Sequence, residues 1–164
     1  MPISSSDIIY RLSGGASNSD PNAALGGAKS SVAAGSDILD AVSSAEAAAG
    51  DINYRCVYVH NAHATLTLLG AKVWIQAQTP SADTDVAIGL GTSAISGTEQ
   101  TIANEATAPS GVTFSQPSSF AGGLSIGDLA PGESKAVWVR RTVNAAAALA
   151  SDSFTLRVQG DTNP

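Results

Sequence analysis

The chain has 164 residues, 43% of them hydrophobic, and a domain of this length buries roughly 70% of the surface that its unfolded chain would expose. Only 13% of the residues are Asp, Glu, Lys or Arg, against about 25% in an ordinary soluble domain, and such a sparsely charged surface favours assembly over a free monomer. The net charge is −6 and the eight basic residues are scattered, which excludes the basic stripe of a nucleic-acid-binding protein, and the single cysteine excludes an internal disulfide.

The start of the chain, MPISSSDIIY, has neither the basic residues nor the long apolar run of a signal peptide. The sequence contains no run of about 18 apolar residues, so it predicts no membrane span. We therefore expect a protein that is made and kept in the cytosol until something releases it, with no membrane partner and no direct nucleic-acid partner.

The N-terminal 36 residues predict a strand followed by an arm. Ile8, Tyr10 and Leu12 recur at every second position, as in a short strand. Residues 14–36 are mostly Gly, Ala, Ser and Asn and carry too little bulky apolar surface to fold alone. A segment of this length without apolar anchors predicts a long loop or extended arm that a neighbour in an assembly could order.

Residues 37–50 predict the one short helix. Ile38, Leu39 and Val42 recur at helical spacing, Asp37 is an acidic candidate cap, and Gly50 is a natural stop. The sequence therefore divides into an N-terminal strand and extended Gly/Ala/Ser-rich arm over 1–36 and a β-sandwich over 37–164, within one domain overall.

Strand patterns dominate from residue 54 onward. Residues 54–60 are apolar in both registers, as expected for a central strand covered on both sides. The apolar phase then slips by one at Leu69-Gly70, as a bulge or bend at a strand glycine would produce. Residues 86–90 alternate between apolar and small or polar side chains, which predicts a strand with one apolar face.

The C-terminal half continues this pattern. Short strands are expected at 100–103 and 112–115, and Pro131-Gly132 predicts a tight turn, since Pro fixes φ and Gly supplies a positive φ. The strand after the turn carries four side chains on the same face: Val137, Val139, Arg141 and Val143. The last strand has a core-facing row, Phe154, Leu156 and Val158, and an outward row, Thr155, Arg157 and Gln159. Seven or eight short strands predict an all-β fold, a two-sheet antiparallel sandwich of jelly-roll or immunoglobulin-like type.

The grouping that most resembles a reactive site is Cys56, His60 and His63. A zinc site would need a fourth ligand or a water, and the chain has no further Cys or His. The same residues could imitate a Cys–His nucleophile pair, which requires a spatial partner and an oxyanion site. We expect instead a buried thiol and two histidines in turns.

The sequence shows no coherent set of catalytic or metal-binding residues. Ser125 has the G-x-S-x-G spacing, in Gly123–Gly127, but the residues around it do not predict the strand, sharp turn and helix of a nucleophile elbow. Four aspartates are candidate calcium ligands but lack a D-x-D-x-D-G loop: Asp51, Asp83, Asp85 and Asp128. We therefore expect no catalytic residues, no metal and no cofactor, in a protein that is not an enzyme.

The two tryptophans are expected on the more polar faces of their strands, each beside a cation. Trp74 shares its register with Lys72, and Trp138 shares its register with Arg140. Both rings could pack under a loop or inside the second sheet, or form a carbohydrate platform. The functional hypothesis is that they are exposed anchors of a protein–protein contact, where Trp and Arg are enriched. The candidate interface residues are then Trp74, Trp138, Arg140 and Lys72.

Several longer stretches resemble a group of small virion proteins of tailed bacteriophages. These are IIYRLSGGASNSDPNAALGG near the start, INYRCVYVHNAHATLTLLGAKVWI and TPSADTDVAIGLG in the middle, and TIANEATAP, LAPGESKAVWVRRTVNA and SDSFTLRVQGDT later on. The resemblance extends over nearly the whole chain. It lies in the general sequence of these segments rather than in a catalytic signature.

The resemblance implies a virion structural protein, and in particular a capsid cement or decoration protein on the capsid exterior, synthesised in the host cytoplasm. Its expected partners are the major capsid protein and copies of itself, as a dimer or trimer. The arm would pair with a neighbour's sheet edge, and the tryptophans would be the anchors. A neck, tail or fibre-associated protein has a similar composition, and a glycan-binding module is a rival that 5% aromatic residues does not favour.

Overall fold

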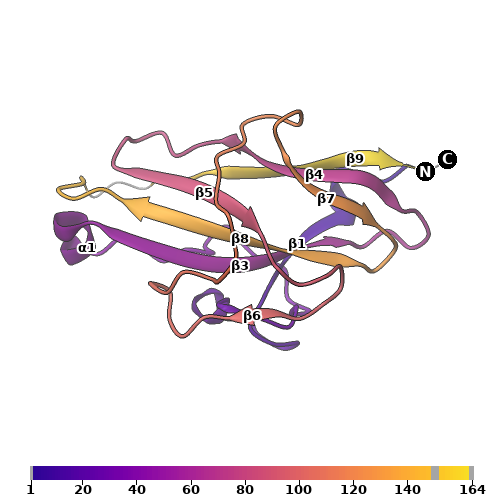
Figure 1. The fold of residues 1–164 in the computed structure, drawn as a ribbon, viewed down its shortest axis with the longest axis horizontal. Coiled ribbons are helices and arrows are strands. Elements are labelled where there is room, and N and C mark those ends of the chain that lie inside the picture. Colours follow the sequence, from indigo (N-terminus) through magenta and orange to yellow (C-terminus); the bar gives the residue numbers. More distant parts are fainter. Residues whose placement is uncertain (1, 149–151, 163–164) are drawn as a thin grey trace.

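The computed structural model describes residues 2–148 and 152–162, and within them the chain is built from antiparallel strands with one short α-helix (Figure 1). The strands are β1 (Ile8–Leu12), β2 (Gly26–Gly27), β3 (Asp51–Asn61), β4 (Leu68–Ala77), β5 (Thr84–Leu90), β6 (Glu99–Thr101), β7 (Leu124–Leu129), β8 (Ser134–Val143) and β9 (Thr155–Thr162). The helical elements are α1 (Ser44–Ala49) and two 3-10 turns, η1 (Ser5–Asp7) and η2 (Pro21–Ala23). The prediction of an all-β fold with at most one short helix is confirmed.

A four-stranded and a three-stranded sheet share the main core. The four-stranded sheet has the order β1-β3-β8-β5, and the three-stranded sheet has the order β7-β4-β9. Val57 and Val139 from the first sheet and Val73 and Ile75 from the second are at most 3% exposed and belong to one apolar cluster. The long strands run between α1 at one end of the molecule and the two chain termini at the other (Figure 1).

β3 is the central strand of the four-stranded sheet and is covered on both faces, as its sequence predicts. It pairs with β1 on one side and, along nearly its whole length, with β8 on the other. Val57 and Val59 enter the main core, whereas Cys56 and Tyr58 enter a second apolar cluster on the opposite face. The absence of polar alternation in residues 54–60 follows from this double burial.

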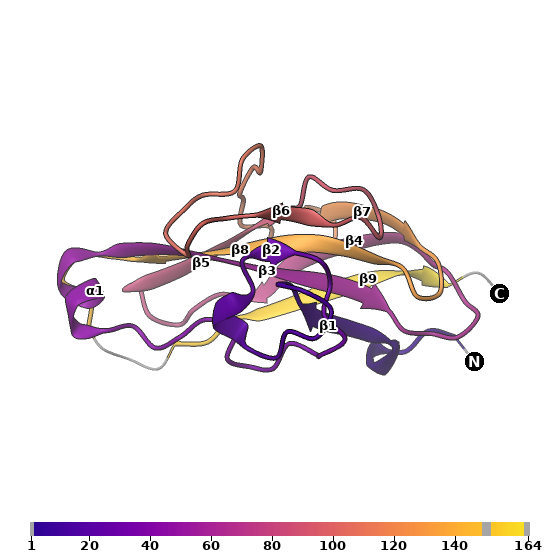
Figure 2. The ribbon, with the colours of Figure 1, turned by 90° about the horizontal axis from the view of Figure 1, so that it is seen from below.

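The second cluster lies beneath the small sheet formed by β2 and β6, which covers the outer face of the four-stranded sheet (Figure 2). The hydroxyl of Tyr58 donates a hydrogen bond to the Gly27 carbonyl over 2.6 Å and accepts one from the Glu99 N–H over 3.0 Å. This one side chain therefore ties the central strand to both strands of the covering sheet.

Residues 14–36 form a long, mostly irregular loop that packs on the rest of the chain, so of the two predicted alternatives the loop agrees with the structure and the extended arm does not. Ala24 and Ser30 within the segment are fully buried. The Cys56 N–H donates to the Ala24 carbonyl over 2.8 Å, and the Leu12 N–H donates to the Val32 carbonyl over 3.1 Å. The segment therefore pairs with the edges of its own β1 and β3, and β1 and the segment belong to the same folded unit as the sandwich.

Small residues allow this pairing, because they let backbone approach backbone. Gly26 has a φ of +94°, and a side chain placed there would begin 1.8 Å from the Gln100 carbonyl oxygen. Only glycine fits that position. The composition that suggests a loose arm instead serves a segment held by backbone hydrogen bonds.

The helix is shorter than predicted and starts at a different cap. Ser43 is the N-cap, and it forms a capping box with Glu46, whereas residues 37–42 are not helical. Ile38 is buried in the main core, so its spacing with Leu39 reflects packing of an irregular segment. Gly50 ends the helix as expected. No helix in the described ranges is long and apolar enough to span a membrane.

Most strands agree with the sequence pattern, including the break in β4. Gly70 has a φ of +55° and the β4 ladder shifts register on both sides of it, which confirms the bulge. The Pro131-Gly132 turn is also confirmed, because Gly132 has a φ of +82° and the Glu133 N–H donates to the Ala130 carbonyl. β7 was not expected, and 112–115 form a single bridge from Ser115 to β5 instead of a strand.

Candidate interaction surface

Three of the four outer edges of the two large sheets are occupied or distorted. Backbone hydrogen bonds from residues 30–34 fill the edge of β1. Ile88 of β5 exchanges two backbone hydrogen bonds of 2.9 Å with Ser115. β7 carries a bulge at Gly127, whose φ is +91°, and its pairing with β4 is irregular there. Covering and bulging are the usual ways in which proteins keep strand edges from pairing with other chains.

β9 keeps its outer edge open. Within 2–148 and 152–162, its backbone has no hydrogen bonds outside the ladder with β4. Both register irregularities of that ladder insert the extra residue into β4, so β9 itself runs without a bulge. It also contains no proline and no lysine. The strand therefore presents a regular row of unpaired backbone groups.

The open backbone groups of β9 can be assigned. The Ile75 N–H donates to the Pro117 carbonyl over 2.8 Å, so Ile75 turns its backbone away from β9. Its partner in the ladder is Leu156, so the two residues form a non-hydrogen-bonded pair of the antiparallel ladder. In such a pair both residues point their backbone groups away from each other, so the N–H and C=O of Leu156 point outward. Backbone direction alternates along a strand, and the outward-pointing set is Leu156, Val158, Gly160 and Thr162.

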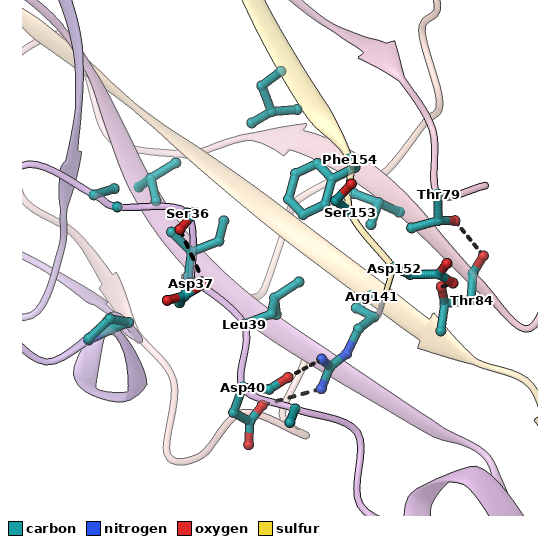
Figure 3. Close-up of a pocket in the computed structure, with 18 of the residues that line it drawn as sticks. Ser36, Asp37, Leu39, Asp40, Thr79, Thr84, Arg141, Asp152, Ser153 and Phe154 are labelled. Atoms are coloured by element: carbon teal, nitrogen blue, oxygen red, sulfur yellow. Dashed lines mark hydrogen bonds and ion pairs between the residues drawn. The ribbon is translucent and has the colours of Figure 1, made fainter. Parts of the chain in front are cut away.

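An apolar groove borders this edge. It consists of a cavity of about 1000 Å³ beside the start of β9 and a second of about 430 Å³ beside the rest of the strand, and Tyr10 and Leu156 line both. Figure 3 shows the larger cavity, with Phe154 on one side and Leu39 on the other. Tyr10, Leu156 and Val158 pack on the main core but stay partly exposed. Their exposure marks the side on which the sandwich is incompletely closed.

The outer face of the three-stranded sheet carries Trp74 and Lys72, two of the predicted interface residues. The Trp74 ring meets Phe120 edge to face with 5.8 Å between ring centroids, and the Arg157 guanidinium lies 5.8 Å from the Trp74 centroid. The Lys72 ammonium lies 5.2 Å from the Phe120 centroid. Trp74 is only 6% exposed, whereas Phe120 is 40% exposed, so Phe120 is the aromatic side chain that a partner could reach.

Trp138 and Arg140 lie on the outer face of the other sheet, away from the Trp74 group. Trp138 is fully buried in the second cluster, so an exposed anchor at this position is wrong and the ring packs under loops instead. Its indole Nε1 has no hydrogen-bond partner within the described part of the chain. The Arg140 guanidinium lies 5.4 Å from the Phe114 ring centroid. The four predicted interface residues therefore do not form one surface.

Cys56, His60 and His63 do not converge either. Cys56 is fully buried, and burial raises the pKa of its thiol. His60 lies within β3 rather than in a turn, with its Nδ1 atom 3.1 Å from the Lys29 ammonium. His63 does lie in a turn, where its Nδ1 accepts hydrogen bonds from the backbone.

The four candidate calcium ligands are spread over the molecule. Each accepts a hydrogen bond from a different partner: Asp51 from Asn53, Asp83 from Ser81, Asp85 from Gln116 and Asp128 from Gly70. In residues 2–148 and 152–162, no three or more His, Cys, Asp or Glu side chains are grouped so as to hold a metal ion.

Two buried arginines lie near one end of the larger cavity. Arg55 is 1% exposed and its guanidinium lies 2.5 Å from the Glu105 carboxylate. Arg141 is 7% exposed and bonds to the Asn53 side chain and to the Asp40 carboxylate. Both cations are paired by the protein itself, so the network holds the irregular segment around Asp40 in place.

No protein-family model, no curated protein and no solved structure matches this chain. The candidate surface therefore depends on the geometry of the β9 edge. The sequence patterns did not single out Asp161 on β9 or Phe120, which packs against Trp74 on the outer face of the three-stranded sheet. The regular alternation of 154–162, free of proline and lysine, predicts a strand without edge-protecting residues, but only the sheet order shows that this strand lies at an edge.

Proposed function

We propose that this chain is a structural protein of a tailed-bacteriophage virion, and specifically a capsid cement or decoration protein that binds the outside of the head and bridges neighbouring major capsid protein subunits. The open edge of β9, with its apolar groove, is the observation that carries this proposal, because it marks a chain that assembles with other protein chains, copies of itself included. An unpaired edge and partly exposed apolar side chains are features through which chains pair with one another. The resemblance to small virion proteins supplies the class of partner.

In this role the chain acts by contact, without an enzymatic step and without a cofactor. Packaged DNA pushes the capsomers apart, and a bridging sandwich resists by adding contact area at many equivalent positions. Each contact can be modest, because a repeating lattice multiplies its effect through avidity. A sparsely charged surface, with 13% Asp, Glu, Lys and Arg, suits a chain that lies against other protein.

We also propose that the sandwich is immunoglobulin-like rather than a jelly roll. In the four-stranded sheet β1 and β3 are neighbours, and β8 and β5 follow them in the order β1-β3-β8-β5. This resembles the ABED sheet of immunoglobulin domains, whereas a jelly roll has eight strands in two Greek keys. The three-stranded partner, β7-β4-β9, differs from the immunoglobulin CFG sheet because β7 precedes β8 in the chain.

The proposal is tested by mixing the purified protein with phage heads that lack a decoration protein, with isolated tails, and with a glycan array. We expect saturable, stoichiometric binding to heads, measured by co-sedimentation. Binding to tails alone would move the chain to the neck, tail or fibre class, and binding to glycans alone would contradict a structural role. A Phe120→Ala variant, matched with Phe114→Ala in the segment that covers the four-stranded sheet, reports whether the outer face of the three-stranded sheet takes part.

A further inference from the structure

We propose that two copies of this chain pair β9 with β9 around a twofold axis, so that their three-stranded sheets join into one continuous six-stranded sheet. In this arrangement the strands run antiparallel, with Gln159 of each copy opposite Gln159 of the other. The proposal rests on the β9 edge alone and does not depend on binding to a phage head.

The direction of the backbone groups fixes which registers are possible. Leu156, Val158, Gly160 and Thr162 point their N–H and C=O outward, so hydrogen-bonded pairs across the axis must join two even-numbered residues. Centring the axis on Gln159 places Val158 opposite Gly160 of the second copy and Leu156 opposite Thr162. All four outward-pointing residues of each strand are then paired.

Charge selects this register from its neighbours. β9 carries one cation, Arg157, and one anion, Asp161, and both side chains are exposed on the outer face of the sheet. With the axis on Gln159, each Arg157 lies opposite Asp161 of the second copy. If the axis is centred on Arg157 instead, the two arginines lie opposite each other. If it is centred on Val158, each charged side chain lies opposite a neutral one. Opposite charges across a strand pair stabilise it and like charges destabilise it.

The apolar groove completes the interface. Four apolar side chains are partly exposed along the edge, and a strand added beside β9 would cover them: Ile8, Tyr10, Leu156 and Val158.

The other open candidate for pairing, β7, is distorted by its bulge at Gly127. Pairing of β9 with β9 is therefore self-complementary and closes at two copies, whereas pairing of β9 with β7 would continue into a filament.

A cysteine placed at the axis tests the register directly. Residues opposite each other in a non-hydrogen-bonded pair have Cα atoms about 4.5 Å apart, which is within the range of a disulfide. A Gln159→Cys variant should therefore form a covalent dimer under mild oxidation. In the matched Arg157→Cys variant the two copies of the new thiol are about 13 Å apart, and no covalent dimer should form. The native Cys56 is fully buried and provides no background.

A charge-swap cycle tests the pairing without a cross-link. Arg157→Asp and Asp161→Arg should each raise the dimer dissociation constant at least about tenfold, because two attractive pairs become repulsive. The double variant restores opposite charges across the axis and should recover the wild-type constant. Within one chain, positions 157 and 161 are about 13 Å apart, so rescue reports a contact between copies.

Sedimentation of the full-length protein over a range of concentrations gives the dissociation constants. Val158→Pro removes an outward N–H and should abolish the dimer, whereas Val158→Ala keeps that N–H and should retain it. Unfolding curves confirm that each variant is folded. A wild-type chain that stays monomeric at millimolar concentration, a Gln159→Cys dimer no more abundant than that of Arg157→Cys, or a double variant without rescue would overturn the proposal.

Discussion

The guanidinium of Arg141, in the interior of the sandwich, lies 3.2 Å from the carboxylate of Asp40, which stands 101 positions earlier in the chain. The same carboxylate lies 3.7 Å from the guanidinium of Arg55. Asp40 therefore faces two buried cations from a segment that has no regular secondary structure. It is the electrostatic link between residues 37–43 and the four-stranded sheet.

We expect Asp40→Ala to lower the free energy of unfolding by about 1–3 kcal/mol. Removing one partner of a buried pair costs about 3–5 kcal/mol when the remaining charge is left alone. The cost is smaller here because Arg55 keeps Glu105, Arg141 keeps Asn53, and the Asp40 side chain is 40% exposed. Urea unfolding followed by tryptophan fluorescence measures the change.

Asp37→Ala is the matched control for this prediction. Asp37 belongs to the same segment, is exposed, and accepts its hydrogen bond from the neighbouring Ser36. Its replacement should change stability by less than about 0.5 kcal/mol. Equal effects of the two substitutions would show that the ion pairs contribute nothing beyond the segment's packing.

We expect Glu99 to make the protein less stable in acid. Burial alone would raise the pKa of its carboxyl group, but hydrogen bonds from the Ser93 N–H and the Thr92 hydroxyl lower it to about 2, from 4.5. The folded state thus binds a proton less readily than the unfolded state. The stabilisation is complete above pH 4.5 and is lost as the pH falls from 4.5 to about 2.

A comparison with Glu99→Gln isolates this effect from other carboxyl groups. At pH 6 the variant should be less stable than the wild type by about 1–3 kcal/mol, because it lacks the charged acceptor. The difference should shrink steadily below pH 4.5 and vanish near pH 2. Unfolding curves at each pH give both values, and a difference that stays constant with pH would contradict the assignment.

Much of the fold follows from alternation of apolar residues, and the failures have particular physical causes. β1, β5, β8 and β9 were predictable because their apolar side chains recur with strand periodicity, and β3 was predictable because it is apolar in both registers. β7 was missed because Gly127 and Asp128 disfavour a strand in the intrinsic preferences of its residues. Tertiary pairing with β4 overrides those preferences.

The candidate surface was less predictable than the fold, because it depends on which strands lie at sheet edges. The outward position of Arg157 could be read from the pattern, but the open edge beside it could not. The misassignment of Trp138 has the same origin. Its neighbours Val137 and Val139 point to the main core, and nothing local reveals that residues 98–116 cover the opposite face.

We expect His60 to make stability fall as the pH drops below about 6.5. Burial lowers the pKa of its imidazole, and the nearby charges of Lys29 and Arg11 lower it further, while a hydrogen bond to the Glu133 carbonyl opposes them. Between the lowered value and 6.5, the unfolded state binds a proton that the folded state refuses, so stability rises with pH in this window. His60→Asn should flatten the plot of unfolding free energy against pH between pH 5 and 7, measured by urea unfolding at each pH. A variant whose plot keeps the wild-type slope in this window would contradict the assignment to His60.

We expect Trp138 to matter through its volume and not through its indole N–H. The ring is fully buried among Cys56, Ala136 and Phe114, and its Nε1 has no partner in the described residues. Trp138→Ala should cost about 3–5 kcal/mol, as expected for removing a large core side chain. Trp138→Phe should cost less than about 1.5 kcal/mol, because the volume lost is partly offset by removing a buried donor that bonds to nothing. Chemical unfolding of the two variants measures both changes, and a Phe variant as unstable as the Ala variant would mean that the N–H has a hydrogen-bond partner in solution.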